Sequence, residues 1–131
     1  MESVLTACRA AGCLVQTDAV LAGFTTFRIG GPADCLVTAG TAQQIGQVLS
    51  LCRDTALPCT VIGGGSNLLI SDDGLRGVTL RVGLTDTAPA PQRQGDQLIV
   101  PAGLPLKQLC RLARDSCLAG LEFAYGIPGT V

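Results

Sequence analysis

Three consecutive glycines at 63–65 constrain this chain more than any other feature. They follow the β-prone triplet 60–62 and precede a Ser-Asn pair and a second apolar triplet, 68–70. The pattern predicts a strand, a loop of bare backbone and another strand. Each glycine destabilises a regular element by roughly 0.5–1 kcal/mol relative to alanine, so three in a row indicate that something must approach the loop backbone closely.

Such a loop is suited to an anion. Successive backbone N–H groups without Cβ atoms form a concavity that fits a phosphate or pyrophosphate, and the Ser66 hydroxyl and Asn67 amide can add hydrogen bonds. A glycine-rich β-turn without a ligand is the alternative interpretation. The dinucleotide fingerprint G-x-G-x-x-G is excluded because Leu68 stands at its third glycine, and a Walker loop is excluded because no Gly-Lys-Ser/Thr ending occurs.

The composition fits one folded domain and argues against several classes of partner. Apolar residues make up 47% of the 131 residues and charged residues 15%, which excludes a disordered chain. The net charge is −1 and the nine basic residues are scattered, so no basic stripe is available for nucleic acid. The uncharged windows 35–52 and 55–71 contain glutamines, or a proline and glycines, and neither resembles a membrane span. The N-terminus lacks signal-peptide features, so we expect a cytoplasmic protein.

Seven cysteines and no histidine limit the possible chemistry. An odd number of cysteines without an export signal indicates reduced thiols. Because there is neither a C-x-x-C pair nor a histidine, we expect no zinc or iron–sulfur site and no Ser-His or Cys-His nucleophile. Cys52 lies seven residues after Ile45, and Cys117 seven after Cys110, on the apolar faces of predicted helices. We interpret them as small buried core residues.

Three segments have the period of an amphipathic helix. The first covers 3–13 and ends near Gly12. The second follows Thr41, which forms a capping box with Gln44. The third has Pro105 in its first turn and Gly120 as its stop. The apolar face of the second helix is formed by Ile45, Val48, Leu49 and Cys52.

Short β-prone runs separate these helices. The runs 34–38 and 60–62 flank the second helix, and this strand–helix–strand unit favours parallel strands in an α/β arrangement. Residues 78–82 alternate like a half-buried strand, and 98–100 form another short strand. The remaining segments are an ordered turn over 17–33 and a loop or hairpin tip over 84–97.

Three motifs together identify a family. Residues 26–33 read TFRIGGPA, residues 62–69 read IGGGSNLL, and residues 122–131 read EFAYGIPGTV. In this order they resemble the UDP-N-acetylenolpyruvoylglucosamine reductase family, also called UDP-N-acetylmuramate dehydrogenases. The resemblance covers residues 25–131 and implies an FAD-binding fold of the PCMH type, shared with vanillyl-alcohol-oxidase-like proteins, of mixed α/β (α+β) class.

The resemblance implies a cytoplasmic flavoenzyme of peptidoglycan synthesis, with roles in cell-wall biogenesis, cell shape and cell division. In the family, NADPH reduces FAD, and the reduced flavin passes hydride to the enolpyruvyl ether of a UDP-sugar before a general acid protonates the neighbouring carbon. The implied cofactors are therefore FAD and NADPH, and the UDP-sugar is the implied substrate. Flavin does the redox chemistry, while protein supplies orientation and charge stabilisation.

The family's cofactor-contacting positions can be placed on this chain. The triple-glycine loop would hold the FAD pyrophosphate, 102–103 would lie beside the cofactor, and the second glycine-rich loop, 126–131, would line it. Arg28 could shape the flavin pocket, or could make a structural salt bridge or loop hydrogen bond. The implied cofactor-binding residues are Ile62, Gly63, Gly64, Gly65, Ser66, Asn67, Leu68, Ala102, Gly103, Gly126, Ile127, Pro128, Gly129 and Val131.

The chain departs from the family pattern after Val131. Family members continue with the rest of the FAD-binding domain and a substrate domain that carries the serine proton donor and charged catalytic residues. We therefore expect residues 1–131 to be the N-terminal portion of the FAD-binding domain, truncated within its second subdomain and inactive alone. No catalytic residue is assigned. The alternatives are another FAD-linked oxidoreductase of the same superfamily and a non-catalytic nucleotide-binding domain.

Overall fold

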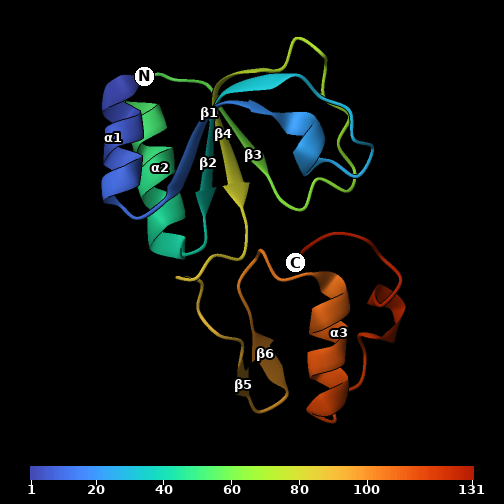
Figure 1. Cartoon of the computed structure of the whole chain (residues 1–131). Helices are drawn as coiled ribbons and strands as arrows, with labels where there is room; N and C mark the ends of the chain where they lie inside the picture. Colours follow the sequence, from blue (N-terminus) through green and yellow to red (C-terminus); the bar gives the residue numbers. More distant parts are fainter.

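The computed structural model describes residues 1–131, which form two bodies with the carboxyl terminus between them (Figure 1). None of the helices combines the length and apolar character needed to cross a bilayer. The amino-terminal body holds α1 (Glu2–Ala10), β1 (Leu14–Val20), the 3-10 helix η1 (Leu21–Phe24), β2 (Pro32–Ala39), α2 (Ala42–Asp54), β3 (Cys59–Ile62) and β4 (Leu75–Val82). The carboxyl-terminal body holds β5 (Gln92–Gln94), β6 (Gln97–Ile99), α3 (Leu106–Asp115) and the 3-10 helix η2 (Glu122–Ala124).

A four-stranded sheet in the order β1-β2-β4-β3 forms the centre of the amino-terminal body. β1 runs antiparallel to β2, whereas β2 and β3 both pair with β4 in parallel. The predicted unit β2–α2–β3 therefore exists and its strands are parallel in direction. They are not neighbours, because the chain returns through residues 63–74 and inserts β4 between them.

The predicted capping box at the start of α2 is present. The Gln44 backbone N–H donates to the Thr41 hydroxyl oxygen at 3.1 Å, and the Thr41 backbone N–H donates to the Gln44 side-chain oxygen at 3.2 Å. Gln44 is buried, and its side-chain amide also donates to the carbonyls of Ala11 and Gly12 at 3.2 and 3.1 Å. The Gln44 side chain thus caps the start of α2 and links it by hydrogen bonds to the end of α1. Such pairing satisfies donors that the first turn of a helix leaves free.

Two hydrophobic clusters fill this body, one on each face of the sheet. The larger packs the sheet against α1 and α2, and it includes Cys8, Cys13, Cys35 and Cys52. Burial raises the pKa of all four thiols, that of Cys35 to about 11 and that of Cys52 to about 12. The interpretation of Cys52 as a core residue is confirmed. The smaller cluster consists of Leu21, Ala33, Leu36, Ile62 and Ile70.

Several predictions for the sheet are wrong. Val78, Thr79 and Leu80 are all 0% exposed, so β4 is not a half-buried strand; it is central, with both faces covered. Residues 68–70 form no strand. The predicted turn over 17–33 in fact begins with the end of β1. The residues of β1 alternate only weakly in hydrophobicity, because β1 is an exposed edge strand.

The predicted helix faces also need correction. On α2, Leu49 is 40% exposed, because the buried stripe follows Gln44, Val48 and Cys52. On α3 the apolar face includes Cys110, which is buried as expected, but Cys117 is exposed. The helix ends at Asp115, well before Gly120.

The residue at position 117 explains where α3 ends. Cys117 has φ +55°, the left-handed conformation that stops a helix. The next N–H, that of Leu118, then turns back to the Ala113 carbonyl at 2.9 Å. A left-handed cysteine in this role carries no sequence signal, whereas the glycine three residues later suggested a later stop.

Candidate functional site

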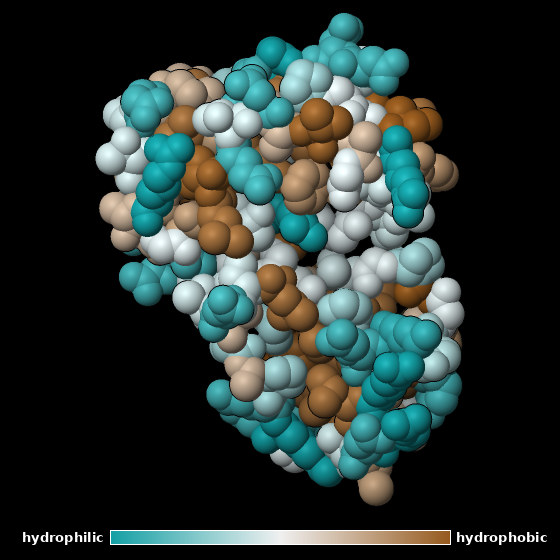
Figure 2. Space-filling model, in the orientation of Figure 1, coloured by the Kyte–Doolittle hydropathy of each residue, from teal (hydrophilic) through white to brown (hydrophobic).

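A cleft of about 260 Å³ lies between the loop after β3 and the last loop of the chain. It lies where the two bodies meet, and Figure 2 shows the surface hollowed between them. Its lining contains no charged side chain, so any attraction for an anion must come from backbone and hydroxyl dipoles. The lining residues are Val61, Ile62, Gly63, Gly64, Gly65, Ser66, Asn67, Leu68, Pro128, Gly129 and Thr130.

The backbone of the first wall is rich in free donors. No N–H group from Gly63 to Leu68 donates a hydrogen bond within the chain. The N–H groups of Gly129 and Thr130, on the opposite wall, also lack an acceptor in the chain. This concentration of free donors around one cleft makes it able to bind a hydrogen-bond acceptor.

Two of the three glycines keep the cleft open. A Cβ atom on Gly63 would stand 3.0 Å from the Thr130 hydroxyl, and one on Gly64 would stand 3.4 Å from the Thr130 methyl group. Side chains at these positions would therefore fill the space between the walls. This cradle is the geometry expected of an anion nest.

The third glycine, Gly65, has a structural role. Gly65 has φ +68°, and a Cβ atom there would collide with the Phe24 carbonyl oxygen. The Gly65 carbonyl accepts a hydrogen bond from the Thr26 N–H at 3.0 Å. Only glycine combines this conformation with so close a contact, so Gly65 fixes the triple-glycine loop to the TFRIGG segment.

The TFRIGG segment is itself held rigidly. The buried Thr25 hydroxyl donates to the Ile29 carbonyl at 2.9 Å and accepts from the Ile29 N–H at 3.3 Å. This closed turn places Arg28 on the surface with φ +55°. The Arg28 side chain makes no hydrogen bond or ion pair within residues 1–131, so the proposed structural salt bridge is not formed.

The two walls touch at one point. The Ser66 hydroxyl donates to the Pro128 carbonyl at 3.4 Å, and a Cβ atom on Gly129 would stand 2.9 Å from the same hydroxyl oxygen. The second wall is anchored by the Leu106 N–H, which donates to the Gly129 carbonyl at 3.0 Å. The start of α3 thus positions the loop that faces the glycines.

The structure brings only part of the predicted set together. Of the other predicted residues, Ala102 is exposed, and Gly103 is buried where a Cβ atom would crowd the backbone of Gly83. A packing role therefore accounts for that glycine, and contact with a cofactor stays a prediction. Sequence reasoning missed two lining residues, Val61 in β3 and Thr130, although Thr130 stood inside the quoted GIPGTV motif. The predicted residues outside the cleft lining are Ala102, Gly103, Gly126, Ile127 and Val131.

The cleft suits a hydrogen-bond-accepting anion such as a pyrophosphate. Free N–H donors on both walls, the Thr130 hydroxyl and the Asn67 amide provide many donors with no competing carboxylate, while the Ser66 hydroxyl donates to the Pro128 carbonyl. Within residues 1–131 no group of three or more His, Cys, Asp or Glu side chains is arranged to hold a metal ion. The arrangement can bind and orient a ligand, and it presents no acid or base.

Comparisons with known proteins relate the chain to flavoproteins. A family model described as "FAD binding domain" matches residues 33–131. A UDP-N-acetylenolpyruvoylglucosamine reductase from Clostridium botulinum is 43% identical over 118 residues, which are 89% of this chain and 37% of that protein. A protein of the same name from Desulfosudis oleivorans is 41% identical over 120 residues, with 89% and 38% covered. The chain therefore spans well under half the length of these relatives.

Solved structures show the same fold. The crystal structure of UDP-N-acetylenolpyruvylglucosamine reductase from Thermus caldophilus matches with a TM-score of 0.68 and 33% identity, over 91% of this chain and 40% of that chain. A variant of BBE-like 1 from Physcomitrella patens matches with a TM-score of 0.56 and 16% identity, over 85% and 26%. The second likeness is one of fold alone. The predicted mixed α/β flavoprotein fold is confirmed.

Proposed function

The chain belongs to the FAD-binding domain family, and we propose that it is the FAD-binding part of a UDP-N-acetylenolpyruvoylglucosamine reductase. The free N–H donors from Gly63 to Leu68, facing Thr130 across an uncharged cleft, are the observation that carries the proposal. The similarity to reductases, far above that to the BBE-like protein, favours this activity over another FAD-linked oxidation.

In this proposal the chain's residues hold and orient the cofactor. The N–H groups of the triple-glycine loop bind the FAD pyrophosphate, with the Thr130 hydroxyl and the Asn67 amide as additional donors. The Ser66 hydroxyl joins them when it turns from the Pro128 carbonyl to the phosphate. Gly64 leaves room for the phosphates. The surface in contact with FAD extends beyond the cleft to Ala102, Gly103, Gly126, Ile127 and Val131.

Bound FAD supplies the redox chemistry, taking electrons from NADPH and delivering them to the enolpyruvyl ether of a UDP-sugar. The cleft described here contains no acid to protonate the substrate, so the proton donor of the whole enzyme lies outside this cleft. The proposed setting is peptidoglycan synthesis in the cytoplasm, where NADPH and nucleotide sugars are found. Effects on cell shape and division would follow from that role.

A titration with cofactor fragments tests the binding mode. We expect FAD to bind the chain, inorganic pyrophosphate to compete with it, and riboflavin, which lacks the phosphates, to bind at least about tenfold more weakly, a difference of ~1.4 kcal/mol. Flavin fluorescence measures the binding of FAD and of riboflavin directly, and the binding of pyrophosphate through the displacement of FAD. If riboflavin binds as tightly as FAD, the cleft is not a pyrophosphate site.

A matched pair of proteins tests the activity. Residues 1–131 and the same chain continued to the length of its relatives would be assayed for NADPH oxidation that depends on UDP-N-acetylglucosamine enolpyruvate. We expect turnover only in the longer protein. Inactivity of both would contradict the reductase assignment. Substrate-dependent activity of residues 1–131 would contradict the proposal that this chain only binds FAD and that catalysis needs the rest of the longer protein.

A further inference from the structure

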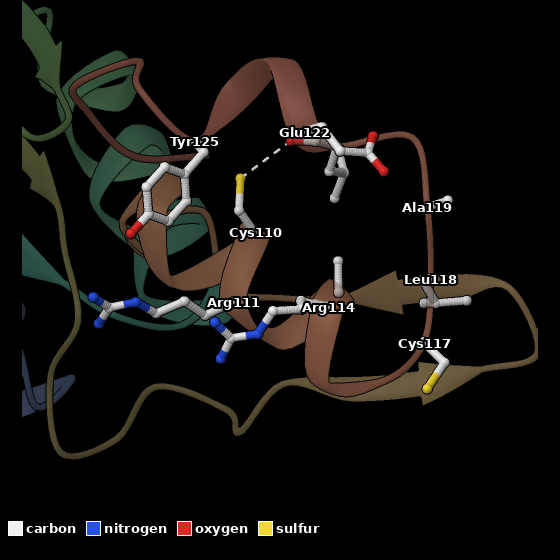
Figure 3. Close-up of a pocket in the computed structure, with 10 residues that line it drawn as sticks. Cys110, Arg111, Arg114, Cys117, Leu118, Ala119, Glu122 and Tyr125 are labelled. Atoms are coloured by element: carbon white, nitrogen blue, oxygen red, sulfur yellow. Dashed lines mark hydrogen bonds between the residues drawn. The ribbon is translucent and has the colours of Figure 1, made fainter.

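Two cationic side chains of this chain rest on aromatic rings, in different places. The Arg81 guanidinium carbon lies 5.1 Å from the centre of the Phe24 ring, and the Lys107 ammonium lies 5.6 Å from the centre of the Tyr125 ring. Figure 3 shows Tyr125 beside a cavity of about 560 Å³ along α3, which shares no lining residue with the glycine cleft. The Lys107 contact thus belongs to the α3 cavity, whereas the Arg81 contact belongs to the sheet that carries the triple-glycine loop.

Arg81 lies near the carboxyl ends of the parallel strands. It is the cross-strand partner of Ile62, the last residue of β3, after which the triple-glycine loop begins. Because adjacent strands are about 4.8 Å apart, the start of this loop lies within reach of an arginine side chain. Val78 and Leu80 belong to the larger cluster, so alternation places Arg81 on the other face of β4, where Phe24 packs against the smaller cluster. Ligands of such sheets bind outside the carboxyl ends of the strands.

The Arg81 guanidinium has no partner for its donors within residues 1–131. It forms no ion pair and donates no hydrogen bond, although it is half-buried. A guanidinium whose plane lies over an aromatic ring keeps its N–H groups free to bind an anion in a fixed orientation. The arginines that do form ion pairs are Arg9, Arg53, Arg76 and Arg114.

Phe24 connects Arg81 to the triple-glycine loop. The Phe24 carbonyl oxygen lies so close to Gly65 that a Cβ atom there would collide with it, and the Thr26 N–H donates to the Gly65 carbonyl at 3.0 Å. The Arg81 Nε atom lies 4.0 Å from where a Cβ atom on Gly83 would stand, at the point where the chain leaves β4 for the carboxyl-terminal body. Arg81 therefore lies at the junction of the two bodies, as the glycine cleft does.

The cleft lining itself supplies dipoles but no charge. A pyrophosphate is an anion, and hydrogen bonds from a charged donor such as a guanidinium are roughly twice as strong as those from neutral donors. We propose that Arg81, positioned by the Phe24 ring, donates to a phosphate oxygen of the FAD pyrophosphate bound by the triple-glycine loop and supplies the positive charge that the cleft lining lacks. The inference rests on the proposed function, and it extends the site to one binding residue and one positioning residue outside the cleft.

Arg81→Gln tests the charged contact in the chain of 131 residues. We expect FAD and inorganic pyrophosphate to bind roughly tenfold to a hundredfold more weakly, the effect of one hydrogen bond to a charged group, and riboflavin to bind as before. Calorimetry measures pyrophosphate, and fluorescence measures the two flavins. Arg76→Gln is the matched control, because it removes the same charge from the same strand at a residue that is paired with Asp34. Equal losses in the two variants would overturn the direct contact.

A double-mutant cycle tests the positioning role of the ring. Phe24→Leu should weaken FAD binding when Arg81 is present and should add nothing to Arg81→Gln, because the ring acts through the guanidinium. Phe24→Tyr retains the ring and should bind FAD as the unaltered chain does. Additive losses from the two substitutions would overturn the positioning role. A tyrosine variant as weak as the leucine variant would do the same.

The separate probes distinguish this inference from the proposed function. If the unaltered chain binds FAD and pyrophosphate, and Arg81→Gln binds both equally tightly, the Arg81 contact is refuted and the proposed function stands. If pyrophosphate binding depends on Arg81 but FAD does not bind, the proposed function is refuted and the contact between Arg81 and a phosphate stands. A loss of riboflavin affinity as large as that of FAD would show that Arg81 maintains the shape of the site and binds no phosphate.

Discussion

The two bodies of this molecule differ in how they are held together. The amino-terminal body has a four-stranded sheet with a hydrophobic cluster of 11 buried residues on one face and one of five on the other. The carboxyl-terminal body has a two-stranded hairpin, α3, and no such cluster. The candidate site takes one wall from each. Its glycine wall is therefore preformed on a rigid support, whereas the wall with Thr130 depends on the weaker body.

The largest expected effect tests this difference directly. Leu80→Ala in the centre of β4 should lower the free energy of unfolding by about 2–5 kcal/mol, because Leu80 is 0% exposed and a cavity would remain in a packed cluster. Leu109→Ala on α3 should lower the free energy of unfolding by less, about 2 kcal/mol at most, because neighbouring groups can move in and fill the cavity. Urea unfolding, followed by hydrogen exchange in each body, gives the comparison. Equal losses would show that the carboxyl-terminal body is as well packed as the other.

A smaller effect separates the structural glycine from the binding glycine on the rigid wall. Gly65→Ala should cost roughly 1–3 kcal/mol, because a non-glycine residue at φ +68° is strained and its Cβ atom meets the Phe24 carbonyl. Gly64→Ala should leave stability unchanged and weaken FAD about tenfold or more, ~1.4 kcal/mol, because its Cβ atom enters the cleft. Thermal unfolding and FAD titration of both variants check this. A Gly65→Ala protein as stable as the unaltered chain would show that Gly65 has no structural role that sets it apart from Gly64.

Sequence patterns predicted local features of the rigid body and missed the order of its strands. The capping box at Thr41 and the glycine loop are local signals, and both are present in the structure. The order of the strands is not local: nothing in residues 75–82 indicates that β4 inserts between β2 and β3. The burial of β4 on both faces follows from that insertion, so its alternating pattern was misleading.

The candidate site shows the same limit. The donors of residues 63–68 follow from glycine composition, so that wall could be predicted. The opposing wall depends on how the chain returns after α3, which begins where Leu106 bonds to Gly129. Thr130 therefore became visible only in the structure. The end of α3 before a left-handed Cys117 lies in the same category, because a cysteine gives no sequence signal for that conformation.

Alkali should weaken the amino-terminal body in particular. Cys35 and Cys52 have pKa values raised by burial to about 11 and about 12, from an ordinary value of 9.0. The unfolded thiols ionise first, so the stability from these neutral thiols is complete below pH 9 and is lost as the pH rises through 11 to 12. Urea midpoints in that range should fall less steeply for Cys52→Ala than for the unaltered chain. An identical slope would show that Cys52 does not contribute.

The smallest expected effect probes the wall that the weaker body supplies. Thr130→Val keeps the shape of the side chain and removes the hydroxyl, which faces Gly63 across the cleft. One lost hydrogen bond to the pyrophosphate should weaken FAD by ~0.5–1.5 kcal/mol, about twofold to twelvefold, and should leave unfolding unchanged. Thr130→Ser retains the hydroxyl and is the matched control, measured by the same FAD titration. If the valine variant binds FAD as tightly as the unaltered chain while the serine variant loses affinity, the Thr130 methyl group rather than its hydroxyl contributes to binding. The second wall would then act through packing, and the donors of the cleft would all come from backbone and from the glycine loop.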